Sequence, residues 1–382
     1  MKMNRIFWIA PLLFLWGCEF TSYEEHESKP YDGVFTYTEA TKKAEWKNRF
    51  DHAAVAYDGK MWIFGGYNPG EVRNDTYYED VWNSEDGITW TLVTENAPWH
   101  GRRGHTVNVF DNGNGEAMYL VGGFEVDEET GYRQYTNDVW RSNNGVNWVQ
   151  LKDRTYPALD SLYDWFPRMN HVTVSATHND TSYLYIIGGA TQLENHDGRY
   201  AMEYFNDVWR STDGIEWSRV WNNDYGMRAS HAGAVDPATG KIYIQGGQHG
   251  PMFDAENNAS HPSEDWQWLW TSVDGVNWIA ENDITDFAQD RFWRMEHEME
   301  FFNNTLWTFS GRGTSLMHYG FTYEREYSTW RYDEGLFSMD SNGSAIKPRH
   351  SYATVIFQNK IWFLGGFTSN NGQNNDVWSA EL

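Results

Sequence analysis

One pattern recurs through almost the whole chain: an arginine followed three residues later by a histidine. Five copies are complete and a sixth has tyrosine instead of histidine; the pairs are Arg49/His52, Arg102/His105, Arg168/His171, Arg228/His231, Arg294/His297 and Arg349/Tyr352. The first and last arginines are 300 residues apart in five steps, so the mean period is 60 residues. A repeat of this length indicates an array of similar supersecondary units, which bury their hydrophobic faces against one another.

Each unit has the same internal order. After R-x-x-H comes a strand-like run, and then an apolar run that ends at a glycine pair, as in "KMWIFGG" (60–66). A variable polar loop follows, and then a segment such as "FNDVWRSTDGIEW" (205–217), with a hairpin signal before its last tryptophan. No stretch has a sustained helical period, so each unit reads as four short strands, a to d. Four-stranded units repeated in this way predict an all-β fold, the β-propeller.

The glycine pair after strand b, the aromatic residue in strand c and the tryptophan in strand d resemble kelch repeats. The resemblance covers Arg49 to the C-terminus and implies a six-bladed β-propeller, with blades that start near residues 49, 102, 168, 228, 294 and 349. The last copy stops at Leu382 without a strand d. Segment 33–46 begins like a strand and ends in Trp46, so we expect it to complete the last blade and close the ring of a 33–382 propeller domain.

A comparison of the copies separates scaffold from candidate sites, because a residue needed by every blade recurs. In the hairpin between strands c and d, an aspartate precedes glycine at Asp86, Asp213 and Asp274, but the second copy has Asn144. Asparagine suits the same turn and cannot replace a carboxylate base. The aspartates are therefore predicted to shape the turn.

The repeated arginines and histidines admit two interpretations. Since they occur in nearly every unit, they are expected to join neighbouring blades through hydrogen bonds. Alternatively they line a polar channel that binds an anion or a glycan hydroxyl, with Arg102, Arg168, Arg228 and Arg294 as ligand-binding residues.

Six tryptophans stand outside the repeat positions and the N-terminal segment. We predict that they lie in loops on one face of the propeller; they are Trp99, Trp165, Trp221, Trp266, Trp268 and Trp293. Flat indole faces suit stacking on sugar rings, which makes these residues candidate ligand-binding groups. Packing of the loops or the core is the alternative.

The fifth unit departs most from the others. Glu296, Glu298 and Glu300 alternate at its start, which places them on one face of a strand, and Arg294 and Arg312 are the expected partners. If the chain is an enzyme, Glu296, His297, Arg312 and Glu324 are the candidates for acid/base and anion-holding roles. Decay of the repeat is the alternative explanation.

Residues 1–17 read as a signal peptide: Lys2 and Arg5 precede the apolar run 6–16, which is too short to span a bilayer. The following "LWGC" resembles the lipobox of bacterial lipoproteins, which implies lipidation of Cys18, the only cysteine, and a tether over 18–32. The resemblance predicts a lipid-anchored protein of the cell envelope, at the outer membrane and facing the cell surface.

The formal net charge of −25 argues against nucleic acid as a partner, and against membrane contact other than through the lipid. No Cys/His metal-ligand cluster occurs in the sequence, so neither a metal nor another cofactor is expected. Among kelch propellers, galactose oxidase chemistry requires a Cys–Tyr crosslink and copper, and a lipidated Cys18 leaves no cysteine for it.

Two functional hypotheses remain. The first is a propeller that binds carbohydrate or a partner protein of the envelope through its loop face. The alternative, by analogy with kelch-type sialate mutarotases, is a mutarotase or epimerase that acts on a sugar by acid/base chemistry. Whether the protein is an enzyme stays open at this point.

Overall fold

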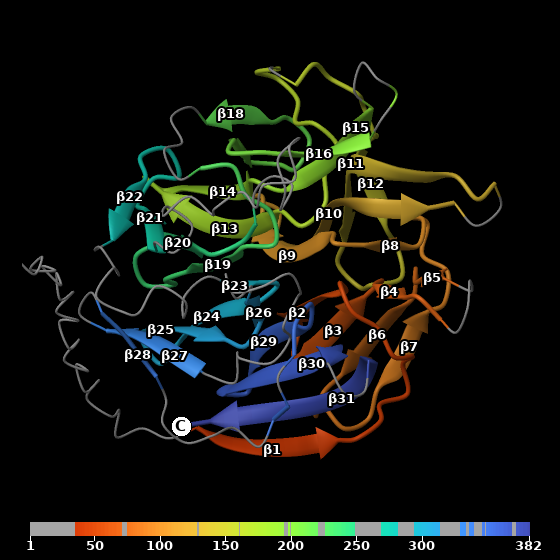
Figure 1. Cartoon of the computed structure of the whole chain (residues 1–382), viewed down its shortest axis with the longest axis vertical. Coiled ribbons are helices and arrows are strands. Elements are labelled where there is room, and N and C mark those ends of the chain that lie inside the picture. The colour runs from red at the N-terminus through yellow and green to blue at the C-terminus, as the bar shows by residue number, and fades with distance from the viewer. Residues whose placement is uncertain are drawn as a thin grey trace, which may run out of the picture.

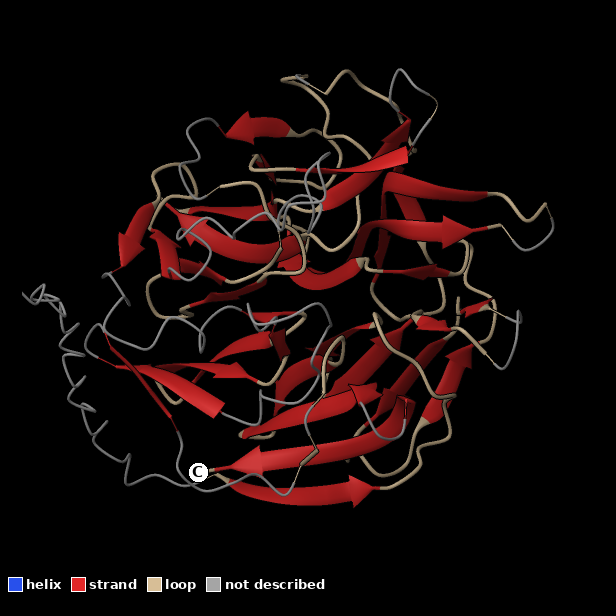
Figure 2. Cartoon of the chain, in the orientation of Figure 1, coloured by secondary structure: helices blue, strands red, loops and turns tan. Residues whose placement is uncertain are grey.

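The computed structural model describes residues 35–70, 75–127, 130–159, 161–194, 198, 200–220, 226–248, 269–281, 294–313, 329–333, 336–339, 346–347, 349–368 and 372–382. All regular elements in these ranges are β-strands (Figure 2). The predicted signal peptide, Cys18 and the tether lie outside the described residues, as do Trp221, Trp266, Trp268, Trp293 and Glu324.

Strands from each repeat unit form one antiparallel sheet, numbered here by its unit. Sheet 1 contains β2 (Ala53–Tyr57), β3 (Lys60–Phe64), β6 (Val81–Ser84) and β7 (Thr91–Thr94). Sheet 2 contains β8 (Arg102–Arg103), β9 (Thr106–Asp111), β10 (Glu116–Val126), β11 (Arg133–Ser142) and β12 (Val149–Lys152). Sheet 3 contains β13 (Val172–His178), β14 (Thr181–Ile187), β17 (Val208–Ser211) and β18 (Ser218–Val220).

The later units follow the same plan. Sheet 4 contains β19 (Ala232–Val235), β20 (Ile242–Gln245), β21 (Leu269–Ser272) and β22 (Ile279–Glu281). Sheet 5 contains β24 (Glu298–Phe302), β25 (Thr305–Phe309), β27 (Thr329–Asp333) and β28 (Leu336–Met339). Sheet 6 contains β29 (Ala353–Phe357), β30 (Lys360–Thr368), β31 (Gly372–Glu381) and β1 (Thr36–Thr41).

Three short two-stranded ribbons accompany these sheets among the described residues. They are β4 (Tyr67–Asn68) with β5 (Thr76–Tyr77), β15 (Ala190–Glu194) with β16 (Tyr200–Tyr204), and β23 (Arg294–Met295) with β26 (Arg312–Gly313).

The sheets form a propeller-like ring around a central axis (Figure 1). In each unit the strand that follows the R-x-x-H segment lies innermost, and these strands contact one another in a cycle: β2, β9, β13, β19, β24, β29 and again β2. The prediction of an all-β fold is thus confirmed.

The hydrophobic core is divided among the contacts between consecutive sheets. One cluster joins sheets 1 and 2, with Trp62 and Phe64 packed against Met118 and Trp148, and others join the following pairs of sheets around the ring. Stability therefore depends on each sheet having a neighbour on both sides.

The N-terminal strand β1 pairs antiparallel with β31, and Thr36 lies opposite Glu381. The tryptophan expected to end this strand has a different place, because Trp46 lies beyond β1 and is fully buried near Trp90. Phe35 takes the position of the strand-d aromatic instead, with its ring 4.6 Å from that of Trp307 in sheet 5.

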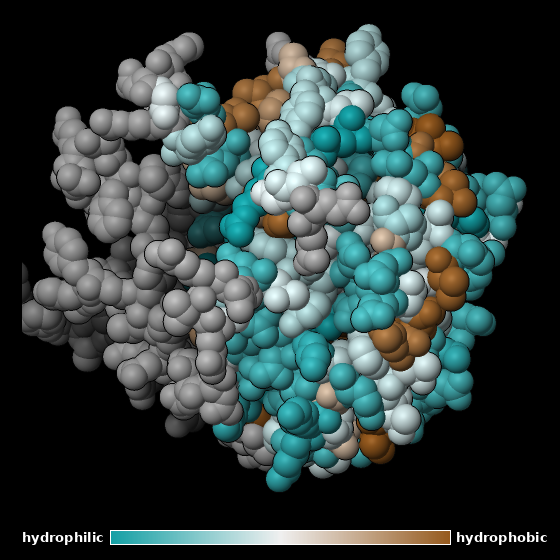
Figure 3. Space-filling model, turned by 90° about the vertical axis from the view of Figure 1, so that its right-hand side faces the viewer, coloured by the Kyte–Doolittle hydropathy of each residue, from teal (hydrophilic) through white to brown (hydrophobic). Residues whose placement is uncertain are grey.

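Hydrophilic residues predominate on the face shown in Figure 3, where hydrophobic ones occur in small separate groups. No helix long and apolar enough to cross a membrane is found within the described ranges.

Candidate functional site

The repeated arginine is buried in its own sheet and paired with an acid. Arg168 donates to the Gly188 carbonyl at 2.8 Å, and its two terminal nitrogens bind the two carboxylate oxygens of Asp207. The indole N–H of Trp209 donates to the same carboxylate at 2.7 Å. Equivalent pairs are Arg49–Asp80, Arg102–Asp138 and Arg349–Asp376. The Asp-Val-Trp segment thus supplies the partner that a buried guanidinium requires.

The repeated histidine packs between two sheets. A Cβ added to Gly65 of sheet 1 would lie 2.8 Å from the ring of His105 in sheet 2, so only glycine permits this approach. The next glycine, Gly66, donates its N–H to the Arg102 carbonyl at 2.8 Å. In the sixth unit Tyr352 replaces histidine, and its hydroxyl donates to the Phe309 carbonyl of sheet 5 at 2.7 Å. Both residues of R-x-x-H therefore join neighbouring sheets.

These contacts correct the channel interpretation of the repeated arginines. The side chains predicted to bind a ligand are at most 1% exposed; they are Arg102, Arg168, Arg228 and Arg294. Buried guanidinium groups that bond the sheet's own carbonyls and acids do not face an open channel.

His297 has the same packing position as the other histidines, and a Cβ on Gly246 would lie 2.6 Å from its ring. Burial and the nearby charge of Arg294 keep its pKa well below the usual 6.5, so the ring is neutral. His297 thus has the packing position of the other histidines and also lines the cavity described below, and its acid/base role stays a prediction.

The hydrogen bonds of the c–d hairpins support the turn interpretation. The Asp213 carboxylate accepts from the N–H groups of Ile215 (2.8 Å) and Glu216 (3.0 Å). In the second unit the Asn144 side-chain oxygen accepts the same two bonds, at 3.0 and 2.8 Å. The amide oxygen of Asn144 thus accepts the same two backbone hydrogen bonds as the carboxylate of Asp213.

Two of the predicted sugar-stacking tryptophans lie in the core. Trp99 is 1% exposed and Trp165 is 0% exposed, so neither ring offers a face to a ligand in this structure. Both stand three residues before the repeated arginine, as Trp46 does, and each lies within 6.0 Å of the guanidinium carbon of that arginine. The shared W-x-x-R spacing was the signal, missed in the sequence, that these are repeat positions.

The second residue after each repeated arginine has a separate role. Its backbone N–H donates to the same position of the preceding unit, so that six bonds of 2.8–3.0 Å form a closed cycle through Asp51, Gly104, Asn170, Ser230, Glu296, Ser351 and back to Asp51. All six have positive φ, between 52° and 60°. This conformation is costly for a residue such as Glu296 or Ser351 and is typical of functional positions.

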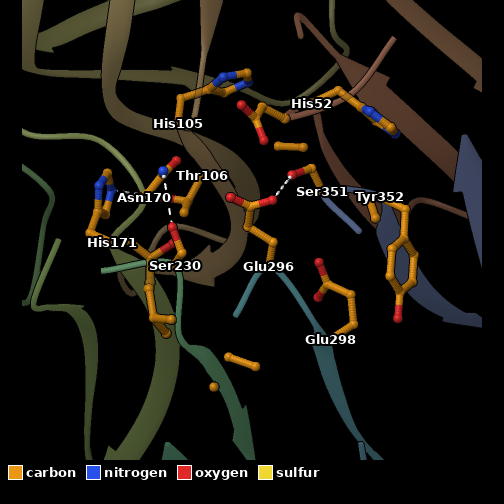
Figure 4. A pocket seen from close by; sticks show the side chains of 18 of the residues that line it. His52, His105, Thr106, Asn170, His171, Ser230, Glu296, Glu298, Ser351 and Tyr352 are labelled. Carbon is orange, nitrogen blue, oxygen red and sulfur yellow. Dashed lines mark hydrogen bonds between the residues drawn. The ribbon is translucent and has the colours of Figure 1, made fainter. Parts of the chain in front are cut away.

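We call these six residues the axial ring. Their side chains differ from unit to unit, whereas the arginine is the same in every unit and the histidine in five. They line one cavity of about 220 Å³, together with the innermost strands of all six sheets. Figure 4 shows Asn170, Ser230 and Thr106 on one side of this axial cavity and Glu296, Glu298 and Ser351 on the other. The amide of Asn170 donates to the Ser230 hydroxyl at 3.1 Å.

The acidic side is centred on Glu296. The Ser351 hydroxyl donates to its carboxylate at 2.7 Å, His350 Nδ1 lies 2.7 Å from the same oxygen, and Arg312 pairs with the other oxygen. Despite burial, the hydrogen bond from His350 and the charge of Arg312 lower the pKa of Glu296 to about 2. Glu296 is therefore ionised at neutral pH.

Asp51 follows Ser351 in the ring, and its pKa moves the other way from that of Glu296. Burial raises it, Arg103, at 3.7 Å, lowers it, and the Glu296 charge raises it again, with a net upward shift. Two neighbouring carboxyl groups with pKa values pushed in opposite directions form an arrangement that acid/base chemistry requires.

Two further acids follow Glu296 along sheet 5. Glu298 lines the cavity, and burial with the nearby Glu300 charge raises its pKa well above 4.5. Burial raises the pKa of Glu300 to about 7, although the Thr354 hydroxyl donates to it at 2.7 Å. Of the two partners predicted for the three acids, Arg312 pairs with Glu296, whereas the Arg294 guanidinium donates to the Ser310 carbonyl at 3.3 Å.

Of the four predicted catalytic residues, the structure brings Glu296 and Arg312 together. Asp51, Ser351, His350 and Arg103 were missed, although all lie in or beside the R-x-x-H copies. A comparison of the six copies at the second position after the arginine would have found Asp51 and Ser351.

No protein-family model matches the chain. Rho GTPase-activating protein gacHH of Dictyostelium discoideum is 28% identical over 173 residues, which make up 45% of this chain and 10% of that protein. The chain thus spans about a tenth of the length of this curated relative. The solved structure of YjhT matches with a TM-score of 0.60 and 14% identity, over 88% of this chain and 96% of that one. Together with the ring of sheets, this similarity shows that the chain has a β-propeller fold.

Proposed function

We propose that this protein binds a carbohydrate at the axial cavity. The observation that carries the proposal is the axial ring: a position held in one backbone conformation in all six units, but occupied by five different residue types around one cavity. Amide, hydroxyl and carboxylate groups that converge on a small cavity suit the hydroxyls of a sugar.

The architecture that supports this site is a six-bladed propeller of the kelch type, in which β1 completes the last blade. The cycle of contacts among the six innermost strands and the pairing of Thr36 with Glu381 support this count and this closure. We further propose that Cys18 carries a lipid and holds the propeller in the cell envelope. Trp221, Trp266, Trp268 and Trp293 remain proposed contacts for a longer glycan or an envelope protein on the loop face.

Titration calorimetry of the full-length protein against a panel of monosaccharides tests the binding. Ser230→Ala removes a hydroxyl from the cavity wall and should weaken binding by about three- to tenfold, since one hydrogen bond is worth about 1 kcal/mol. Ser182→Ala, outside this cavity, is the matched control. A panel without any binding sugar would reject the proposal, and binding only to an envelope protein would favour the protein-partner hypothesis.

A second candidate function is acid/base interconversion of sugar anomers, favoured by the opposite pKa shifts of Asp51 and Glu296. The Glu296 carboxylate would take the proton of the anomeric hydroxyl while Asp51 gives a proton to the ring oxygen. The bond between the anomeric carbon and the ring oxygen then breaks to give the open-chain carbonyl form. Closure on the other face of the carbonyl, with both proton transfers reversed, gives the other anomer.

NMR saturation transfer between the anomers measures this reaction directly. We expect acceleration by the wild-type protein, and a loss of about 10²-fold or more in Asp51→Asn and in Glu296→Gln. Binding without any acceleration, across neutral and sialic sugars, would leave a binding protein and exclude the mutarotase.

A further inference from the structure

A second set of residues, next to the axial ring in the sequence, is aromatic in only half of the molecule. The first residue after each repeated arginine pairs across a short antiparallel bridge with the residue that follows Gly-Gly, or Ser-Gly in the fifth unit. In three units that are consecutive around the ring, the sixth, first and second, every pair contains an aromatic ring, and in the other three none does. The pairs are His350–Phe367, Phe50–Tyr67 and Arg103–Phe124, and then Met169–Ala190, Ala229–Gln248 and Met295–Arg312.

The aromatic rings of these three units are in contact with one another. Tyr77 of β5 lies opposite Tyr67 of β4, and Tyr135 of β11 lies opposite Phe124 of β10. The centres of consecutive rings are 4.7–6.0 Å apart along the whole series, and every ring except that of Tyr77 is half-buried. We call this series the aromatic wall; it consists of Phe367, Phe50, Tyr67, Tyr77, Phe124 and Tyr135.

Arg103 lies between the aromatic wall and the axial cavity. Its guanidinium carbon lies 4.7 Å from the centre of the Tyr67 ring and 5.8 Å from that of Phe124, and its side chain is 28% exposed. One terminal nitrogen faces the Asp51 carboxylate at 3.7 Å, which is longer than a hydrogen bond. No described residue accepts a hydrogen bond from this guanidinium. The rings thus position a cation whose N–H groups are available to a ligand.

His350 makes a second connection between the aromatic wall and the cavity. Its ring lies 5.1 Å from the Phe367 ring, and its Nδ1 lies 2.7 Å from the Glu296 carboxylate. Glu296 and Asp51 both line the axial cavity. The aromatic wall therefore begins directly beside the two side chains that hold the acids of the cavity.

The size of the axial cavity limits what it can hold. Its volume of about 220 Å³ is smaller than the roughly 300–1,000 Å³ typical of sites for drug-sized ligands, so it has room for one sugar ring. The next ring of a longer sugar must then lie outside it. The C–H face of a pyranose packs on aromatic rings while its hydroxyls bond to neighbouring polar groups, and the aromatic wall with Arg103 offers both.

We propose that the aromatic wall and Arg103 form a second sugar subsite, which binds the ring next to the one held in the axial cavity, so that the protein prefers a disaccharide to a monosaccharide. The inference rests on the proposed function, that the cavity binds carbohydrate. It adds a direction, because the sugar leaves the cavity over the sixth, first and second units. In the other half of the molecule the equivalent residues Ala190, Ala229 and Met295 are at most 2% exposed and offer no such surface.

Pairs of a monosaccharide and its disaccharide test the second subsite. Suitable pairs are glucose with maltose or cellobiose, galactose with lactose, and N-acetylglucosamine with chitobiose. Titration calorimetry of the full-length protein at pH 7.5 should give, for the pair that binds best, a disaccharide at least about tenfold tighter than its monosaccharide. Tyr67→Leu, which removes the flat ring, should reduce this gain by about threefold or more and leave the monosaccharide unchanged. Arg103→Lys keeps the charge beside Asp51 but loses the planar fork, and should also reduce the gain.

Tyr183→Leu is the matched control, since the half-buried ring of Tyr183 lies 4.4 Å from the guanidinium carbon of Arg210, in sheet 3 and outside the aromatic wall. Its gain should equal that of the wild type, and thermal unfolding establishes that each variant is folded. Disaccharides that bind no tighter than their monosaccharides would overturn the second subsite but leave carbohydrate binding intact. An unchanged gain in the folded Tyr67→Leu and Arg103→Lys variants, or an equal loss for both sugars of a pair, would overturn the assignment to the aromatic wall. Absence of binding by every sugar would overturn the proposed function itself.

Discussion

The contacts between sheets and the wall of the axial cavity use adjacent residues of the same six segments. The residue type is nearly constant at the contacts between sheets and varies at the cavity wall. Between the sheets, the third residue after the arginine is histidine in five units, and four of these rings pack against a glycine of the preceding unit in a repeated geometry; they are those of His105, His171, His231 and His297. At the axis, the second residue after the arginine is aspartate, glycine, asparagine, serine, glutamate or serine.

The difference separates the structural requirements that all units share from the residues that matter in a single unit. Five of the six contacts between sheets use a histidine, and the contact between sheets 5 and 6 uses Tyr352, so the sequence repeats there with one exception. The axial ring fixes only the backbone, through a cycle of N–H···O bonds, and leaves the side chains free to differ. A single unit can then place two acids at the cavity without disturbing its neighbours.

The largest expected effect concerns the buried histidines. Burial and the adjacent arginines lower the pKa of His52 and of His171 to about 3, and those of the other three fall well below 6.5. The folded state therefore keeps these rings neutral while the unfolded chain takes up protons below about pH 6.5. Stability should be fully present above that pH and be lost as the pH falls toward 3, by about 1.4 kcal/mol per histidine and pH unit.

Urea unfolding between pH 7.5 and 5 measures this loss. His231→Gln should make the dependence on pH shallower by about one proton, whereas His100→Gln, at an exposed position, should not. A free energy of unfolding that stays constant down to pH 5 would contradict the neutral packing of these rings.

The second prediction removes one arginine of the framework. Arg168→Met leaves the Asp207 carboxylate buried without its partner and should cost about 3–5 kcal/mol of unfolding free energy. Arg133→Met breaks an exposed pair with Asp75 and should cost less than about 1 kcal/mol. Equal losses in urea unfolding would show that the buried pairs do not hold the sheets as described.

The third prediction concerns the axial side of the comparison. Because the pKa of Glu300 is raised to about 7 from 4.5, its stabilising contribution is present below about pH 4.5 and is lost as the pH rises through 7. Glu300→Gln should thus stabilise the protein at pH 8, by about 3 kcal/mol, and leave it unchanged at pH 4. Thermal unfolding at both pH values, with exposed Glu95→Gln as control, measures it; destabilisation at pH 8 would mean that a partner compensates the charge.

The smallest effect belongs to the c–d hairpin. Asp213→Ala removes the acceptor of two backbone N–H groups and should cost about 1 kcal/mol, whereas Asp213→Asn restores the arrangement seen at Asn144 and should cost less than about 0.5 kcal/mol. Chemical denaturation of both variants checks this, and equal losses would mean that the charge itself contributes.

The sequence permits prediction of what repeats. The period, the four strands per unit, the turn role of Asp213 and the pairing of β1 with the last strand all follow from comparing copies. For Trp99 and Trp165 the alternative of core packing is the correct one, and the shared W-x-x-R spacing that indicates it was hidden because Trp46 was assigned to a strand. The nearness of Glu296, His350 and Ser351 could not be read from spacing, because these residues belong to two consecutive units and Glu296 and Ser351 are 55 residues apart in the sequence.

The pairing of Thr36 with Glu381 has a consequence for synthesis. β1 has no partner until β31 has been made, so this pair of strands cannot form while Gly372–Glu381 are still inside the ribosome. Because Thr36 lies opposite Glu381, a peptide linker can join the start of β1 to the end of β31. With new termini placed in another loop, this circularly permuted protein should have the same arrangement of sheets.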